Sequence, residues 1–99
     1  MKSDDMLEEL QKKVEKYRKL TEKALKLIEI NGNNSEKENK IASDFLNMAK
    51  NYFNDARHFE GKKDLLTALA AYSYAHAWLD AGVRAHLFKA EDDQLFTLP

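Results

Sequence analysis

The chain of 99 residues is predicted to fold as an all-α protein, with three long antiparallel helices at about residues 4–30, 35–60 and 64–88. Three observations predict this class. Only three glycines and one proline occur, and the proline is the last residue, so few positions can break a helix. Apolar residues recur three and four positions apart, as they do along the buried face of a helix. Residues 65–79 contain no charged side chain, although 33% of the chain is charged, which indicates a helix buried on most of its sides.

The first predicted helix begins at Asp4, with Ser3 as its N-cap. Along it, seven residues alternate steps of three and four through three heptads, which is typical of a coiled-coil seam. These residues are Leu7, Leu10, Val14, Tyr17, Thr21, Ala24 and Ile28. Glutamates alternate with lysines on the rest of the helix, which favours a solvated face over a surface that binds polyanions.

Residues 31–34 are predicted to form the first turn, where Gly32 suits the left-handed conformation of a helix C-cap. Ser35 and Glu38 then have the spacing of a capping box, which marks the start of the second helix. One face of this helix is apolar and rich in aromatic residues. We interpret this face as core rather than as a box for a ligand, because an apolar stripe at helical spacing is the usual buried face of a helix.

The third predicted helix follows a turn at which Gly61 ends the second helix and Asp64 caps the third. This helix has two apolar sides. The first side consists of Leu65, Leu69, Tyr72, His76, Leu79 and Val83. The second side consists of Ala71, Tyr74, Trp78, Ala81 and Ala85. A helix with two apolar sides needs two partners, so a side that the other helices leave uncovered is predicted to be an interface.

Residues 89–99 form a short C-terminal tail, in which an acidic patch precedes the segment Leu-Phe-Thr-Leu at 95–98. This segment is predicted to pack back on the domain. The alternatives are a loosely attached tail or a short peptide for a partner. With the tail included, residues 1–99 are predicted to form a single helical domain.

Composition narrows the function classes. The net charge of −1 is spread evenly along the chain, so nucleic-acid binding is not expected. The chain has no cysteine, which excludes disulfides, zinc–thiolate sites and thiol nucleophiles. The uncharged run at 65–79 is too short and too polar for a membrane span, and the start of the chain lacks the apolar core of a signal peptide. We therefore expect a soluble cytoplasmic protein without a cofactor.

The stretch at 56–75 resembles one tetratricopeptide repeat. Small and aromatic residues stand at the spacings of such a repeat, on either side of the turn: Ala56, Phe59, Ala68, Tyr72 and Ala75. Stacked arrays need about three repeats. The resemblance therefore implies a tight antiparallel hairpin of the second and third helices, and it implies little about peptide binding.

A second resemblance covers most of the chain. The run DARHFEGKKDLLTALAAYSYAHAWLDAGVRAHLF resembles the signature of a small archaeal family known as domain of unknown function 357, mainly at residues 55–57 and 74–82. The resemblance implies an all-helical, cytoplasmic protein of archaeal origin. It brings no activity, cofactor or catalytic residue that could be transferred to this chain.

Among the polar residues, His76 stands out because it lies in the middle of the third helix, on its first apolar side. Tyr72 and Asp80 lie one turn away on either side, and Asp55 could approach across the hairpin. A histidine beside an acid can act as a general base, and His76 with Asp80 could supply two metal ligands. The spacing supplies no further ligand, so we interpret His76 as a structural, hydrogen-bonded residue.

Four charged residues are predicted to form a polar network around the hairpin: Asp55, Arg57, Asp80 and Arg84. Buried pairs of this type fix the register of helices more than they add net stability. The alternative is a site for a small anionic ligand that uses Arg57 and Arg84.

The favoured function is a non-enzymatic module for protein–protein interaction or assembly, as a homodimer or with another protein partner. Its candidate interface residues are Leu7, Leu10, Val14, Tyr17, Tyr74 and Trp78. The alternative is a small-molecule pocket or a cryptic enzyme centred on Tyr72, His76, Asp80 and Arg84. That alternative needs a cavity that reaches His76 from solvent. Nucleic-acid binding along the lysine-rich first helix is the weakest alternative.

Overall fold

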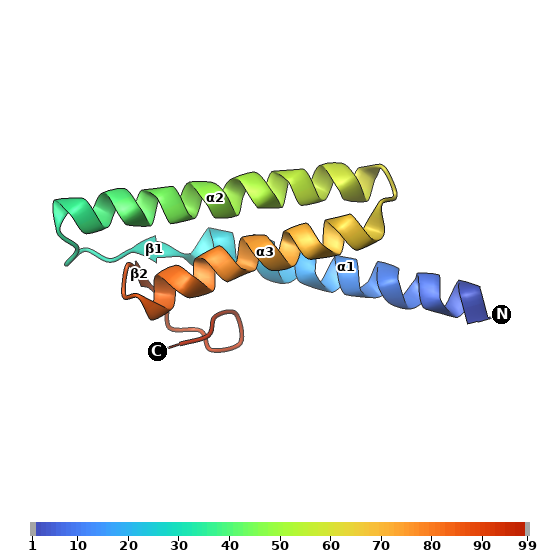
Figure 1. Cartoon of the computed structure of the whole chain (residues 1–99). Coiled ribbons are helices and arrows are strands. Elements are labelled where there is room, and N and C mark those ends of the chain that lie inside the picture. Colours follow the sequence, from blue (N-terminus) through green and yellow to red (C-terminus); the bar gives the residue numbers. More distant parts are fainter. Residues whose placement is uncertain (1, 99) are drawn as a thin grey trace.

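The computed structural model describes residues 2–98 and confirms an all-α fold with three long helices (Figure 1). The helices are α1 (Lys2–Leu27), α2 (Glu36–Gly61) and α3 (Leu65–Arg84). Two short strands, β1 (Glu29–Ile30) and β2 (Phe88–Lys89), follow α1 and α3 and pair antiparallel. Consecutive helices run in opposite directions, and the molecule is elongated, with extents of 55 × 24 × 16 Å.

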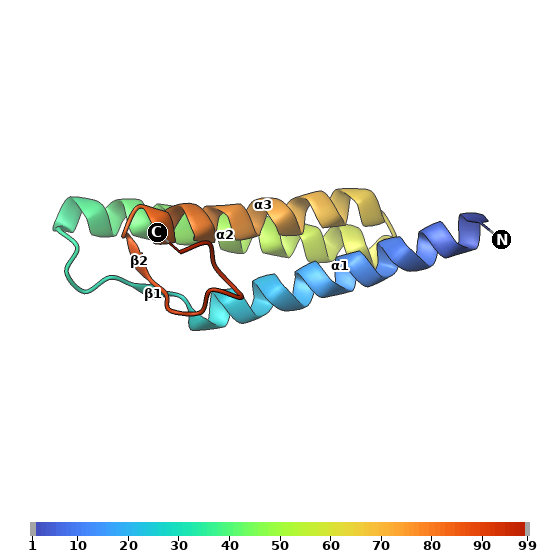
Figure 2. The same ribbon diagram turned by 90° about the horizontal axis from the view of Figure 1, so that it is seen from below.

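The central helix of the fold is α3. It forms a close hairpin with α2, and α1 packs mainly against α3 rather than α2 (Figure 2). The first turns of α1 extend past the α2–α3 turn, which leaves Met6 and Leu7 exposed there. Because two helices pack on α3, most of its surface is covered. Any apolar part of α3 that remains exposed is a candidate interface.

Small residues at steps of seven allow α2 and α3 to approach closely. All of them are buried: Ala42, Ala49 and Ala56 on α2, and Ala68, Ala75 and Gly82 on α3. The last of these positions accepts no side chain, because a Cβ on Gly82 would overlap the ring of Phe88. The alanine-rich composition of this region thus serves the packing of the two helices.

The predicted caps of α2 and α3 are confirmed. The hydroxyl of Ser35 accepts a hydrogen bond from the Glu38 amide at 3.1 Å, and the Glu38 carboxylate accepts one from the Ser35 amide at 2.9 Å. The carboxylate of Asp64 accepts a hydrogen bond from the Thr67 amide at 3.3 Å. These side chains satisfy amides that have no partner within the first turn of a helix.

The predicted C-terminal ends of two helices are wrong. α1 ends at Leu27 rather than near residue 30, and α3 ends at Arg84 rather than near residue 88. Each helix is followed by a strand, and the two strands bond to one another. Backbone groups committed to this small sheet cannot continue a helix, so pairing between distant residues sets both ends.

The predicted caps at Ser3 and Gly32 are also wrong. α1 begins at Lys2, so Ser3 lies within the helix, and no glycine of the described chain has a positive φ. The left-handed positions are Lys63 (φ 67°) after α2 and His86 (φ 60°) after α3. Residues with side chains therefore supply the sharp turns that follow these helices.

The tail packs back on the domain, as predicted in preference to the two alternatives. Leu95 and Phe96 are buried in the same cluster as Leu79 and Val83 of α3. A second cluster surrounds Tyr72 nearer the α2–α3 turn, where α1 supplies a buried valine. The core therefore runs along α3, and the tail closes one end of it.

Candidate functional site

His76 lies in the middle of α3, and both nitrogens of its ring have hydrogen-bond partners. Nδ1 lies 3.1 Å from the Thr21 hydroxyl of α1, and Nε2 lies 2.5 Å from the backbone carbonyl of Leu95 in the tail. A carbonyl oxygen only accepts hydrogen bonds, so Nε2 carries the proton of the neutral ring and Nδ1 accepts from the hydroxyl. The side chain is only 16% exposed. His76 therefore joins α1, α3 and the tail.

Asp80 and Arg84 also hold the tail. Oδ1 of Asp80 accepts a hydrogen bond from the Thr97 amide at 2.9 Å, and Nη1 of Arg84 donates one to the Leu98 carbonyl at 3.1 Å. With His76, these residues stand four positions apart, so they lie along one line of α3. Together they bind the backbone of the tail. The separation between His76 Nε2 and Asp80 Oδ1 is 3.9 Å, too long for a hydrogen bond.

A hollow of about 220 Å³ lies beside this contact, between α1 and the tail. Tyr17 of α1 lines it, and it reaches both His76 and Asp80. Both ring nitrogens of His76 and Oδ1 of Asp80 are already bonded to the protein, however. The arrangement favours a structural role for His76 over that of a general base.

Tyr72 is separate from this line and takes part in a second polar contact. Its ring is fully buried, and its hydroxyl donates a hydrogen bond to Oε1 of Glu60 on α2 at 2.7 Å. The other oxygen of Glu60 accepts from Nη1 of Arg18 on α1. Burial, followed by the neighbouring Glu60 carboxylate, raises the pKa of Tyr72 well above its ordinary value. Glu60 thus joins all three helices, and Tyr72 stays protonated at neutral pH.

The four charged residues predicted to form one network are divided between two places. Asp55 and Arg57 are exposed on α2 near the α2–α3 turn, whereas Asp80 and Arg84 lie on α3 and contact the tail. Among the described side chains, no ion pair joins the two groups. The arginines lie at opposite ends of the hairpin, so the predicted anion site that uses both of them is not formed.

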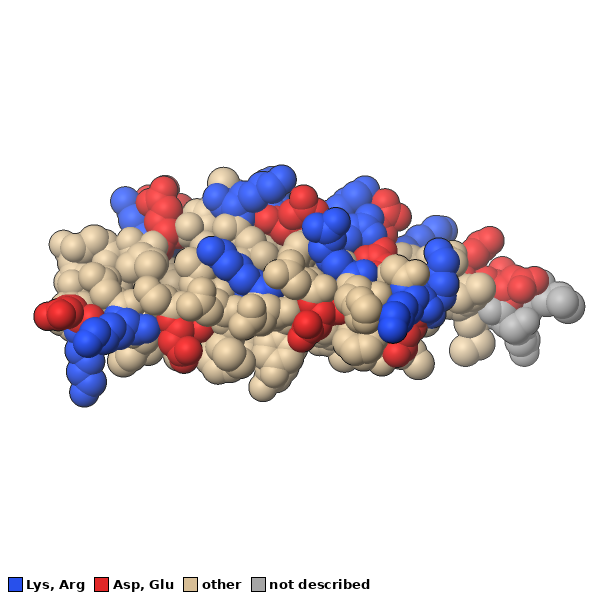
Figure 3. All heavy atoms as spheres, turned by 90° about the horizontal axis from the view of Figure 1, so that it is seen from above, with Lys and Arg blue, Asp and Glu red and all other residues tan. Residues whose placement is uncertain are grey.

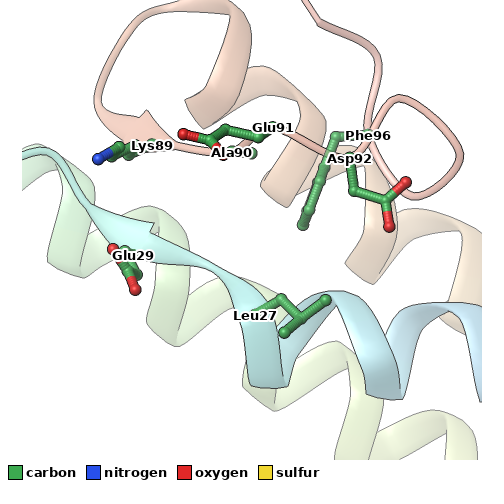
Figure 4. Close-up of a pocket in the computed structure, with 7 residues that line it drawn as sticks. All are labelled: Leu27, Glu29, Lys89, Ala90, Glu91, Asp92 and Phe96. Atoms are coloured by element: carbon green, nitrogen blue, oxygen red, sulfur yellow. The ribbon is translucent and has the colours of Figure 1, made fainter.

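Another hollow, of about 330 Å³, lies between the end of α1, β1 and the tail (Figure 4). Three carboxylates line it, from Glu29, Glu91 and Asp92, but Figure 4 shows them pointing apart rather than toward a common centre. Among the residues that the structure describes, no group of three or more His, Asp or Glu residues could hold a metal ion. Figure 4 therefore shows a surface hollow without the converging ligands of a metal centre.

The predicted interface residues of α1 divide between its covered and exposed faces. Val14 is buried and Leu10 is half-buried, because both pack in the cluster around Tyr72. Leu7 and Tyr17 remain exposed, by 49% and 38%. Val14 belongs to the core of the single chain, which corrects its assignment to an interface.

The two apolar sides of α3 have different surroundings. The first side is covered: Tyr72 and Leu79 on it are fully buried. The second side is largely open. Tyr74 is 51% exposed, whereas Trp78 is half-buried because its ring packs edge-on against Phe45, with ring centroids 5.1 Å apart.

The exposed residues beside Tyr74 form an apolar strip along α3, here called the open face. It consists of Leu66, Ala70, Tyr74, Ala77, Ala81 and Ala85. A shallow hollow of about 230 Å³ lies on this strip, next to Tyr74 and Trp78. Figure 3, which looks down on α2, shows basic and acidic side chains interspersed rather than gathered by sign. Large apolar side chains are also exposed away from this strip, among them Leu27 and Ile41. The open face combines two large exposed apolar side chains, Leu66 and Tyr74, with four exposed alanines.

Sequence reasoning missed Arg18 and Glu60, which link the helices, and Leu66, which is 72% exposed on the open face. A signal for the first pair exists. Glu60 follows buried Ala56 by four residues, and Arg18 follows buried Val14 by four, so each charge lies on a core-facing side of its helix. A charge at such a position indicates a partner across the core.

Comparisons with known proteins bear on the family rather than on an activity. No curated protein and no solved structure matches the chain. No helix in the described part of the chain is long and apolar enough to cross a membrane. A family described as protein of unknown function (DUF357) matches residues 16–88, which is most of the chain. This match confirms the predicted resemblance and shows that the chain belongs to the DUF357 family.

Proposed function

We propose that the protein is a non-enzymatic assembly module that pairs with a second copy of itself through the open face of α3. One observation carries this proposal: α1 and the tail cover the first apolar side of α3, whereas Tyr74 on the second side is still 51% exposed, although the ring of Tyr52 packs edge-on against it. A side chain of this size, half exposed among apolar neighbours, is costly to hydrate. Covering it stabilises a complex by about 25 cal/mol per Å² of apolar surface removed from water.

The composition of the open face favours a second copy as the partner. The face has one large ring, that of Tyr74, and four alanines. In an antiparallel pair of α3 helices, Tyr74 of one copy can face Ala81 of the other, and Ala70 can face Ala85. The ring of Tyr74 then fits against a small side chain, as a knob fits a hole in a coiled coil, and the Ala70–Ala85 pair lets the two helices approach closely. None of the six residues that define the face is charged, so they offer nothing for a charged partner to recognise.

The geometry around His76 supports this function over an enzyme. Both ring nitrogens bind protein groups, and the tail lies over the residues that a substrate would have to reach. Tyr72 forms its own contact with Glu60 and does not join His76. The polar residues on the covered side of α3 therefore stabilise the fold. The open face is left as the surface available to a partner.

Sedimentation equilibrium tests the proposal, at protein concentrations from about 1 µM to about 1 mM. We expect the natural chain to form a dimer and the variant Tyr74→Glu to stay monomeric, because the substitution buries a charge in the paired face. Tyr17→Glu is the matched control, since Tyr17 is a tyrosine of similar exposure on α1. It should leave the dimer intact.

Two results would refute the proposal. One is a natural chain that remains monomeric throughout this range. The other is a dimer that Tyr17→Glu disrupts and Tyr74→Glu does not, which would move the interface to α1.

A further inference from the structure

A polar cleft of about 550 Å³ opens between α1 and the α2–α3 turn. It is distinct from the open face and from the contacts that hold the tail. Three cationic side chains line it, one from each neighbouring segment: Arg18 on α1, Arg57 on α2 and Lys63 in the turn. Its volume falls in the range of roughly 300–1,000 Å³ that is typical of small-molecule sites.

The two acids in the lining already have partners. Both carboxylate oxygens of Glu60 are bonded, one to the Tyr72 hydroxyl and the other to Arg18. The carboxylate of Glu15 lies 2.8 Å from Nζ of Lys19 one turn along α1. A cationic ligand would have to compete with these pairs. Glu60 therefore orients Arg18 and has no oxygen left for a cationic ligand.

Arg57 and Lys63 differ from these acids. No carboxylate among the described side chains lies within ion-pair distance of either of them, although both line the cleft. A guanidinium has five N–H donors, so Arg18 keeps several free after its contact with Glu60. The cleft thus presents unused donors and an excess of positive charge.

We propose that this cleft binds the phosphate group of a small phosphate monoester, through Arg57, Lys63 and the free donors of Arg18. Guanidinium groups match the oxygens of a phosphate in pairs, and the ammonium of Lys63 adds a point charge. Glu60 is a positioning residue, because it holds Arg18 at the edge of the cleft. Arg84, which was considered as an anion ligand, is bonded to the tail and takes no part.

The test is a titration of the full chain with phenyl phosphate, followed by amide chemical shifts at constant ionic strength. We expect saturable shifts at Gly61 and Lys63, which line the cleft, and no saturation when sodium chloride replaces the probe. Arg57→Gln should weaken binding about tenfold or more, because a charge-assisted pair is lost. Arg84→Gln is the matched control, an arginine outside the cleft, and should bind as the natural chain does.

A second variant guards against an effect on folding. Lys63→Asn keeps a residue that tolerates the left-handed backbone at this turn, and it should also weaken binding. The amide spectrum of each variant shows whether the fold is retained. The proposal is overturned by shifts that do not saturate in the natural chain, or by folded Arg57→Gln and Lys63→Asn variants with unchanged affinity. Neither result would affect the proposed dimer, because that interface lies on another part of the chain.

Discussion

Tyr72 and Tyr74 are two residues apart on α3, yet their surroundings are opposite. Tyr72 is fully buried between the three helices and donates a hydrogen bond to Glu60, whereas half of the surface of Tyr74 is in contact with solvent. In the sequence, both belong to apolar sides of the uncharged run at 65–79. Periodicity in the sequence therefore identifies the apolar sides of a helix, while the number of other helices available to pack on it decides which side is covered.

The largest expected difference between the two sides comes from removing each ring. Tyr72→Ala should lower the free energy of unfolding by about 4 kcal/mol, because it leaves a cavity and an unpaired Glu60 oxygen. Tyr74→Ala should lower it by about 1 kcal/mol or less, since its ring is half exposed. Urea denaturation at low protein concentration measures both values without a contribution from association. Equal losses would remove the distinction between the two sides.

The next effect concerns small residues on the two sides. Gly82→Ala should destabilise the fold by about 2 kcal/mol, because the added methyl group overlaps the ring of Phe88. Ala81→Leu, one residue away on the open face, should change stability by less than about 0.5 kcal/mol in the monomer. Thermal unfolding of both variants checks this expectation. A harmless Gly82→Ala would show that Phe88 does not pack on α3 as described.

Alkaline pH should test the buried environment of Tyr72. The pKa of Tyr72 is raised in the folded chain, so the folded state holds its proton more tightly than the unfolded state does. That stability is present below the ordinary tyrosine pKa of about 10 and is lost above it, by up to about 1.4 kcal/mol per pH unit. We expect Tyr72→Phe to flatten the decline in stability above pH 10. An unchanged slope in Tyr72→Phe would contradict this assignment.

The smallest expected effect is local and concerns the contact between the tail and the first apolar side of α3. Asp80→Ala removes the acceptor of the Thr97 amide, so exchange of that amide with solvent should speed up about tenfold. Asp55→Ala, at an exposed aspartate on α2, is the control and should not change the rate. Hydrogen exchange followed by NMR measures both variants. An unchanged rate in Asp80→Ala would mean that Asp80 does not hold the Thr97 amide.

Much of the fold could be predicted because it depends on local signals. Scarce glycine and proline, together with apolar spacing, indicated three helices, and capping residues at Ser35 and Asp64 marked two of their starts. The two strands could not be predicted in this way. Each strand is only two residues long and forms because two segments far apart in the sequence meet. Such short strands have no periodic pattern by which they could be predicted.

The candidate site shows the same limit. His76 was correctly placed on an apolar side, but its partners, Thr21 and the Leu95 carbonyl, come from segments far from it in the sequence. The line of polar residues on α3 was visible in the sequence, whereas its role in holding the tail was not. A backbone carbonyl has no signature in an amino-acid sequence, so a contact with one is found only in the folded chain.

The central claim is that the open face of α3 joins two copies of the chain. The most direct measurement is an NMR experiment on a mixture of isotope-labelled and unlabelled chains that records only contacts between copies. We expect contacts between the Tyr74 ring of one copy and the Ala81 methyl group of the other. Contacts between copies at Leu7 and Tyr17 instead, with none at Tyr74, would contradict it.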